Sequence, residues 1–209
     1  MTSERFYEAP ASGRRRSAPA ALRNREPIAQ VLSDWLPGRG LVLEIASGTG
    51  EHAVYFGQRF PSLDWQPSDA NADALRSISA WRDAAGLANV FEPLAIDASS
   101  ADWPIGRADA VLSINMVHIS PWDSALGLVE GAARILGGGA PLILYGPWLN
   151  PDIPTAPSNL AFDADLKRRD PRWGLRRVAD FADAAEKSFD LVEIRPMPAN
   201  NCMLLLRRR

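Results

Sequence analysis

The stretch that decides the fold reads Leu41-Val42-Leu43-Glu44-Ile45-Ala46-Ser47-Gly48-Thr49-Gly50-Glu51-His52-Ala53. Its first five residues are an apolar run that contains one acid, and a turn of small residues leads from them into a helix. Because glycine has no Cβ, the backbone N–H groups of such a turn and the helix start behind it can approach a ligand closely. The stretch therefore predicts a nucleotide-like cofactor held by Ala46, Ser47, Gly48, Thr49 and Gly50.

Two kinds of cofactor fit this stretch. Gly48-x-Gly50-x-x-Ala53, with Asp69 nineteen residues after Gly50, matches the fingerprint of dinucleotide-binding proteins. Glu44 followed by Ala46-x-Gly48-x-Gly50 resembles the first motif of class I methyltransferases, which use S-adenosylmethionine (SAM). Ala46 stands where that motif usually has a glycine. A turn that binds no ligand is the third interpretation.

The charge near the turn distinguishes between the two kinds of cofactor. A pyrophosphate needs an electropositive helix start, whereas Glu44 and Glu51 put negative charge near this turn. SAM has no phosphate and carries a sulfonium and an ammonium group. The sequence therefore favours SAM and leaves an NAD-linked oxidoreductase as the alternative.

Composition indicates a globular protein that does not bind nucleic acid. The chain has 209 residues, of which 46% are hydrophobic, and a formal net charge of −2. No apolar stretch approaches the roughly 20 residues of a membrane span, and residues 1–20, expected to be a flexible segment, lack the apolar centre of a signal peptide. The single cysteine, Cys202, fits a reducing compartment, so we expect a cytoplasmic protein.

The pattern along the chain predicts a doubly wound, Rossmann-like α/β fold with one domain over residues 21–209, and the resemblance described below implies the class I methyltransferase type of this fold. Apolar runs and helical patterns alternate, which favours a parallel sheet. Expected strands span residues 41–45, 63–67, 90–96, 110–115, 141–145, 189–195 and 202–208. The last two form an antiparallel hairpin on a seven-stranded, mostly parallel sheet. Asn24 is expected to cap the first helix, and the proline-rich residues 146–175 are expected to form a lid-like insertion with a short helix at 159–168.

Polar residues end successive strands of this expected sheet. In open α/β sheets, ligands bind outside the carboxyl ends of the strands. Asp69 suits the ribose hydroxyls, Asp97 suits the adenine amino group, and Asn115 suits the methionine end of the cofactor or the substrate. Taken singly, each of these residues is also consistent with a solvated strand end.

Motifs in order along the chain resemble the class I SAM-dependent methyltransferase-like proteins of domain of unknown function 938, the methyltransferase-like protein 26 family. They are Arg23-Asn24-Arg25-Glu26-Pro27-Ile28, Leu43–Ala53, Trp65-Gln66-Pro67-Ser68-Asp69, Ile114–Pro121, Tyr145-Gly146-Pro147, Asp170–Gly174 and Met197–Asn201. The resemblance implies a methyltransferase fold and SAM at Glu44, Gly48, Asp69, Asp97 and Asn115. Asn24, His52 and Met116 flank these positions and are expected cofactor contacts. The family's helix start reads Ala-Glu-Arg-Asn, whereas Leu22 stands in place of the acid here.

The chemistry expected at such a site is methyl transfer to a small molecule. His118, just past the fourth expected strand, is a candidate general base because its ordinary pKa of about 6.5 suits proton removal. A structural histidine beside the cofactor is the alternative. Acceptor contacts are expected from Tyr145, Trp148, Asn159 and Trp173, unless these side chains only pack the loop onto the body. No metal-ligand spacing occurs, and the oligomeric state is left open, as is a SAM-binding protein without turnover.

Overall fold

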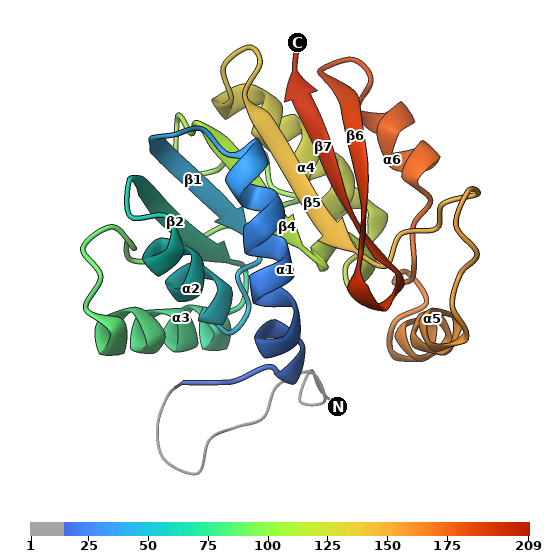
Figure 1. Ribbon diagram of the computed structural model, residues 1–209, viewed down its shortest axis with the longest axis horizontal. Helices are drawn as coiled ribbons and strands as arrows, with labels where there is room; N and C mark the ends of the chain where they lie inside the picture. The colour runs from blue at the N-terminus through green and yellow to red at the C-terminus, as the bar shows by residue number, and fades with distance from the viewer. Residues whose placement is uncertain (1–14) are drawn as a thin grey trace.

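A seven-stranded sheet forms the centre of the computed structural model, which describes residues 15–209 (Figure 1). The strand order is β3-β2-β1-β4-β5-β7-β6. Strands β1 to β5 run parallel, and β7 is antiparallel to both β5 and β6. The strands are β1 (Gly40–Ile45), β2 (Leu63–Asp69), β3 (Leu94–Ala95), β4 (Ala110–Ile114), β5 (Pro141–Gly146), β6 (Phe189–Met197) and β7 (Asn201–Arg208). This arrangement confirms the predicted fold class.

Helices cover both faces of the sheet. They are α1 (Pro19–Trp35), α2 (Glu51–Arg59), α3 (Ala72–Ala85), α4 (Trp122–Ile135), α5 (Pro157–Arg169) and α6 (Val178–Ala185). In Figure 1, α1 crosses in front of the sheet and α4 lies behind it. One apolar core, with Phe56 and Trp65, joins α1 and α2 to one face, and a second, with Leu128 and Phe181, joins α4 and α6 to the other. Because both faces are buried, the central strands are continuously apolar.

The first helix starts earlier than the sequence predicted. It begins at Pro19 rather than after Asn24, and Pro27 lies inside it. Pro19 occupies the first helical turn, where its missing N–H costs nothing, and the alanines that follow favour helix. The predicted cap at Asn24 is therefore wrong, and that side chain is free for another contact. Of the expected flexible segment, residues 1–14 lie outside the described residues, and its last two residues are helical.

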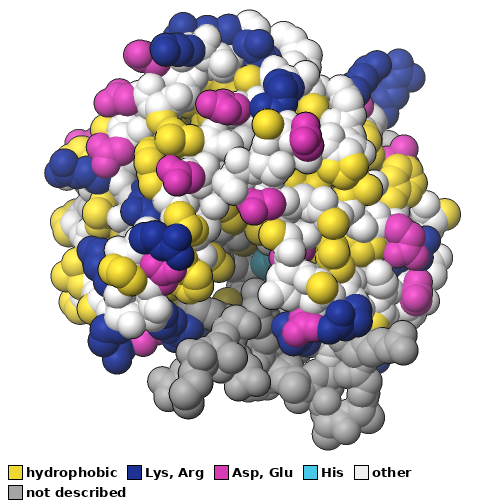
Figure 2. Space-filling model, turned by 180° about the vertical axis from the view of Figure 1, so that it is seen from behind, with side chains coloured by type: hydrophobic (Ala, Val, Ile, Leu, Met, Phe, Trp, Pro, Cys, Tyr) yellow, Lys and Arg dark blue, Asp and Glu magenta, His cyan; other side chains and the backbone are white. Residues whose placement is uncertain are grey.

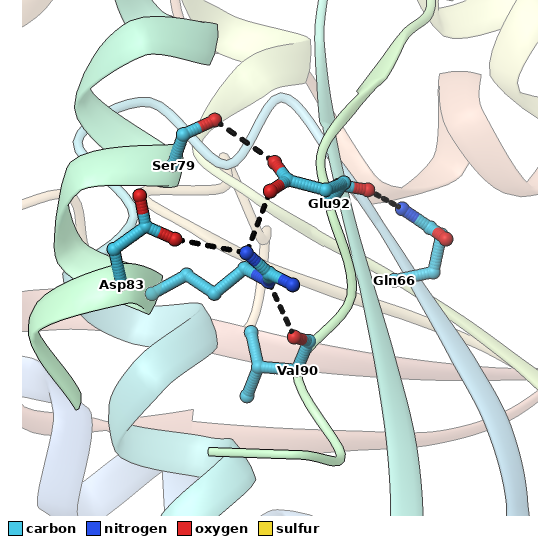
Figure 3. Close-up of polar contacts among 6 residues, drawn as sticks. Gln66, Ser79, Asp83, Val90 and Glu92 are labelled. Carbon is cyan, nitrogen blue, oxygen red and sulfur yellow. Dashed lines mark hydrogen bonds and ion pairs between the residues drawn. The ribbon is translucent and has the colours of Figure 1, made fainter. Parts of the chain in front are cut away.

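The third strand is shorter than predicted because side chains hold the chain that leads into it. Arg82 on α3 donates to the carbonyl of Val90 (3.0 Å) and to the carboxylate of Glu92 (2.6 Å). Gln66 on β2 donates to the Glu92 carbonyl, 2.6 Å away, and Ser79 donates to the Glu92 carboxylate (Figure 3). The backbone of this segment also pairs with β2 at one point, where Val90 forms an isolated parallel bridge with Trp65. Continuous strand pairing is confined to Leu94–Ala95.

The proline-rich insertion is tied to the C-terminal hairpin. The hairpin turns at Pro198–Asn200, and the Asn159 amide of α5 donates to the Asn200 carbonyl at 2.9 Å. The Asn200 side chain in turn accepts from the Ala156 N–H at 2.8 Å. Across residues 15–209, no helix combines the length and the apolar character that crossing a membrane requires.

Candidate functional site

A cavity of about 120 Å³ lies at the carboxyl ends of β1 and β4, under the start of α1. This is the end of an open α/β sheet at which ligands bind. Its lining includes eight residues that the sequence predicted: Asn24, Glu44, Ala46, Ser47, Gly48, Thr49, His52 and Asn115. The remaining lining residues, which the sequence analysis missed, are Ala18, Ala20, Ala21, Ile114 and Ile119.

The glycine-rich turn at the cavity uses left-handed backbone conformations. Ala46 has φ of 60°, Gly48 of 58° and Gly50 of 91°. A Cβ at Gly50 would lie 2.7 Å from the Cα of Ile78, so this glycine lets the turn pack against α3. Gly50 is not part of the cavity wall, and its role is this packing contact.

Glu44 is the acidic side chain of the cavity wall. It is 1% exposed, and its Oε2 accepts a hydrogen bond from the indole Nε1–H of Trp65 at 2.6 Å. Burial raises the pKa of Glu44 to about 8; the Trp65 hydrogen bond opposes this rise and the nearby charge of Asp69 adds to it. The carboxyl is therefore mostly protonated at neutral pH, and a cation beside it would favour the ionised form.

Asp69 and Asp97 lie outside the cavity wall. At the end of β2, Asp69 accepts from the N–H of Gly48 and the N–H of Asn71, both at 2.9 Å, so its carboxylate touches the glycine-rich turn. Burial raises its pKa against the effect of these bonds. Asp97 is exposed, and its Oδ1 accepts from the N–H and the hydroxyl of Ser99. The structure thus places Asp69 next to the turn and Asp97 in a local turn of its own.

Asn24, His52 and Tyr145 form a polar group beside the cavity. The Nε2 of His52 lies 2.8 Å from the Oδ1 of Asn24, and the Asn24 side chain also hydrogen-bonds Tyr145. Burial, with a smaller effect of Arg25, lowers the pKa of His52 to about 4, so the ring is neutral at pH 7. Since the carbonyl oxygen of Asn24 can only accept, it holds the proton on Nε2 of His52.

Histidine surface is visible inside a hollow in Figure 2. Of the two histidines, His52 is 9% exposed and His118 is 0% exposed.

His118 has the contacts of a structural histidine. Its Nδ1 accepts from the N–H of Arg176 at 3.3 Å, its ring stands edge-on to Trp148, and its Nε2 has no partner among the described residues. Burial first, and then the charge of Arg176, lower its pKa to about 3. The ring is closed off from the cavity wall, and this geometry favours the structural alternative over a general base. Met116 is likewise in the core, not on the wall.

The four expected acceptor contacts do not come together at the cavity. Trp148 packs in the core against His118 and Phe181, with ring centroids 4.6 and 5.4 Å apart. Asn159 is bonded to the hairpin, and Trp173 is half-buried in the insertion. Tyr145 comes nearest, through Asn24. The packing interpretation of these side chains agrees with the structure better than the acceptor pocket does.

Glu51 does not face the cavity. Its carboxylate accepts from the hydroxyl of Ser17 at 2.8 Å, the N–H of Ala18 at 2.6 Å and the hydroxyl of Thr49 at 3.1 Å. The chain just before α1 is thereby attached to the start of α2. The sequence offered no signal for this contact, since 33 residues separate Ala18 from Glu51.

A larger groove, of about 690 Å³, lies at the opposite ends of the strands, between Trp35, Asp109, Gly138 and Arg207. It is remote from every predicted cofactor residue, and the carboxyl ends of parallel strands are where such folds bind ligands. We therefore assign the site to the smaller cavity.

Comparison with known proteins supports the same fold. The model of the family described as "Protein of unknown function (DUF938)" matches residues 15–208. Mitomycin 7-O-methyltransferase MmcR superposes with a TM-score of 0.78 at 18% identity, over 92% of this chain and 55% of its own. CalO1, a methyltransferase in calicheamicin biosynthesis in its form bound to S-adenosylhomocysteine (SAH), has a TM-score of 0.73 at 13% identity, over 91% and 54%. A candidate methyltransferase from Bacillus halodurans has a TM-score of 0.66 at 18% identity, over 90% and 98%.

The present chain spans just over half the length of the first two of these structures. At identities below 20%, the likeness to all three establishes the fold.

Proposed function

The chain belongs to the DUF938 family, and we propose that it is a SAM-dependent methyltransferase that acts on a small-molecule acceptor. The similar solved structures are methyltransferases by their descriptions, and one of them holds SAH, the product that SAM leaves after methyl transfer. The closer identification with methyltransferase-like protein 26 rests on the sequence motifs.

The residue types of the cavity wall are the main support for this proposal: the wall has an acidic residue and no basic one. Glu44 is the acidic residue of the wall, and none of the lining residues is Lys or Arg. His52 is neutral because of its lowered pKa. A pyrophosphate placed here would face a carboxyl group without a cation to balance its charge, whereas a sulfonium or ammonium group would be stabilised. The wall thus suits a cationic ligand.

The strand order of the sheet also argues against an NAD-linked oxidoreductase. Dinucleotide-binding folds commonly have the parallel strand order 3-2-1-4-5-6. Here an antiparallel strand, β7, is inserted between β5 and β6. The chain superposes over nine-tenths of its length on structures described as methyltransferases, which supports the SAM proposal over the oxidoreductase.

We assign roles in the reaction to residues at the cavity. SAM, when bound, supplies a methyl group on a positively charged sulfur. Glu44 and the turn from Ala46 to Thr49 hold the methionine end, and Asp69 accepts from the ribose hydroxyls. Asn115, Asn24 and His52 form the polar wall at which the acceptor is aligned. Alignment of acceptor and methyl group contributes about 7–11 kcal/mol to such reactions. We assign Asp97 as the acceptor for the adenine amino group. We assign no proton transfer to His118.

Label transfer tests the proposal. The full chain is incubated with methyl-tritiated SAM and a small-molecule extract from which protein and nucleic acid have been removed. We expect tritium to enter an extractable compound, and Glu44→Ala to abolish this transfer. Binding of SAM without any transfer would favour the non-catalytic SAM-binding protein, and failure of the wild-type chain to bind SAM would refute the proposed function.

A further inference from the structure

The chain from Arg16 to Ala21 closes the candidate cofactor cavity. Ala18, Ala20 and Ala21 form one wall of it, and the other walls come from the ends of β1 and β4 and the start of α2. The strand ends are fixed by the sheet ladders on both sides. The wall made by residues 18–21 consists of Ala18 and the first turn of α1, and the chain that leads into this turn is attached to α2 and α3 by side-chain contacts. We call residues 16–21 the strap.

The cavity under the strap is too small for the ligand. Sites for small molecules and cofactors usually enclose about 300–1,000 Å³. This one encloses about 120 Å³. A nucleoside-sized cofactor therefore cannot lie wholly inside it unless a wall moves. Of its walls, the strap is the one that no sheet ladder fixes.

Two anchors fix the strap. The first is the buried Glu51 carboxylate, which is 4% exposed and accepts from Ser17, Ala18 and Thr49. The second is on α3: the N–H of Arg16 donates to the Ser77 hydroxyl at 2.8 Å, and the indole N–H of Trp81 donates to the Arg16 carbonyl at 2.7 Å. The Arg16 guanidinium also pairs with the Asp73 carboxylate on α3 at 3.1 Å, but these two side chains are 31% and 46% exposed. Because an exposed ion pair is screened by water and the Glu51 carboxylate is buried, the Glu51 anchor is the stronger.

We propose that Glu51 is a positioning residue that clasps the strap over bound cofactor, and that release of this clasp sets the rate of cofactor exchange. The inference rests on the proposed function for the identity of the cofactor. The clasp itself concerns only Glu51, Ser17 and Ala18, so it can be tested separately. Because the strap bears alanines toward the cavity, it excludes water there without adding a polar group.

Hydrogen exchange tests the clasp without any ligand. In the full chain, Glu51→Gln replaces the charged acceptor by a neutral amide of the same size. We expect the peptide that covers residues 15–21 to exchange at least tenfold faster than in the wild type, while peptides from α4 exchange at the wild-type rate. Glu186→Gln, an exposed carboxyl at the end of α6, is the matched control and leaves the strap unchanged. Equal strap exchange in Glu51→Gln and the wild type would overturn the clasp.

Dissociation of tritiated SAH tests the gating. After a chase with unlabelled SAH, we expect Glu51→Gln to release label at least tenfold faster than the wild type, and Ser17→Ala to lie between them. Circular dichroism confirms that each variant is folded, and the milder Ser17→Ala keeps the test decisive if Glu51→Gln does not fold. Faster strap exchange with an unchanged release rate would refute gating. A wild-type chain that binds no SAH would refute the proposed cofactor, while the exchange measurement still decides the clasp.

Discussion

The indole Nε1–H of Trp65 on β2 donates a hydrogen bond to Oε2 of Glu44 on the neighbouring strand β1, with 2.6 Å between nitrogen and oxygen. This bond gives the carboxyl a partner that does not carry a charge. With no cation beside it, burial dominates, and the pKa of Glu44 rises to about 8. The same arrangement that keeps this carboxyl neutral at pH 7 prepares it for a cationic ligand, which would favour its ionised form.

Glu44 is expected to lower stability as the pH rises from about 4.5 to about 8, and above about pH 6.5 the histidines no longer oppose this loss. The folded chain keeps the proton on Glu44 up to about pH 8, whereas the unfolded chain releases it near the ordinary value of 4.5. The folded state thus binds more protons in this range, and the free energy of unfolding decreases by about 1.4 kcal/mol per pH unit. Urea denaturation at several pH values measures this slope. Glu44→Gln, which keeps an acceptor for Trp65, should remove it, and the exposed-site variant Glu186→Gln should keep it. A slope that survives in Glu44→Gln contradicts the assignment.

The two histidines act in the opposite direction at lower pH. The folded state holds the pKa of His52 at about 4 and that of His118 at about 3, against an ordinary 6.5. Below pH 6.5 the unfolded chain therefore binds protons that the folded chain does not. Each histidine then lowers the free energy of unfolding by about 1.4 kcal/mol per pH unit as the pH falls toward its folded-state pKa.

Nuclear magnetic resonance of the imidazole nitrogens measures this directly, since the chain has only two histidines. We expect both rings to be neutral at pH 5.5, with the proton on Nε2. Spectra in urea supply the unfolded control. An imidazolium signal from either ring at pH 5.5 in the folded chain would disprove the expected burial effect.

Asp69→Ala is expected to weaken SAM binding by about 1.5–3 kcal/mol, or about 10–150-fold, because it removes a charged acceptor for the ribose hydroxyls. The same change frees the N–H of Gly48, so part of the loss comes from the turn. Calorimetric titration of SAM gives both affinities. Asp102→Ala, at an exposed carboxylate with no bond to the site, is the matched control. Unchanged affinity in Asp69→Ala would eliminate the ribose role.

Gly146→Ala is expected to destabilise the fold beneath the site. A Cβ at Gly146 would lie 2.4 Å from Nε2 of His118, and this ring is enclosed by Trp148 and Arg176. Overpacking of this kind costs about 1–3 kcal/mol. At Gly137 nothing lies within 4 Å of the same position, so Gly137→Ala should change stability by less than about 0.5 kcal/mol. Thermal unfolding compares the two variants. Similar melting temperatures would contradict the prediction, because they would show that the His118 ring moves aside without loss of stability.

Most of the fold could be predicted because local patterns of apolar and polar residues indicate its helices and strands. Strands form near each of the expected starts at residues 41, 63, 110, 141 and 189, and β4 and β5 are buried along their whole length. The errors lie where contacts between residues distant in the chain determine the structure. Before β3, the side chains of Arg82 and Gln66 bond the backbone and only Val90 bridges to β2. Pro19 starts a helix that the sequence analysis began at Asn24.

Much of the cofactor wall was predictable for the same reason, since one continuous stretch supplies six of its thirteen lining residues. The acceptor side of the site was not predictable. Trp148 and Asn159 were expected to contact the acceptor, but they pack against Phe181 and Asn200, which are distant in the chain. The strap was missed because its attachment joins Ala18 to Glu51, and neither residue type indicates such a partner.

Calorimetric titration of the full chain with SAM, SAH, NAD and NADP tests the central claim most directly. The acidic cavity wall predicts that SAM and SAH bind with micromolar dissociation constants and that the two dinucleotides give no binding heat. Binding of NAD or NADP in place of SAM and SAH would contradict the proposed function and favour the oxidoreductase.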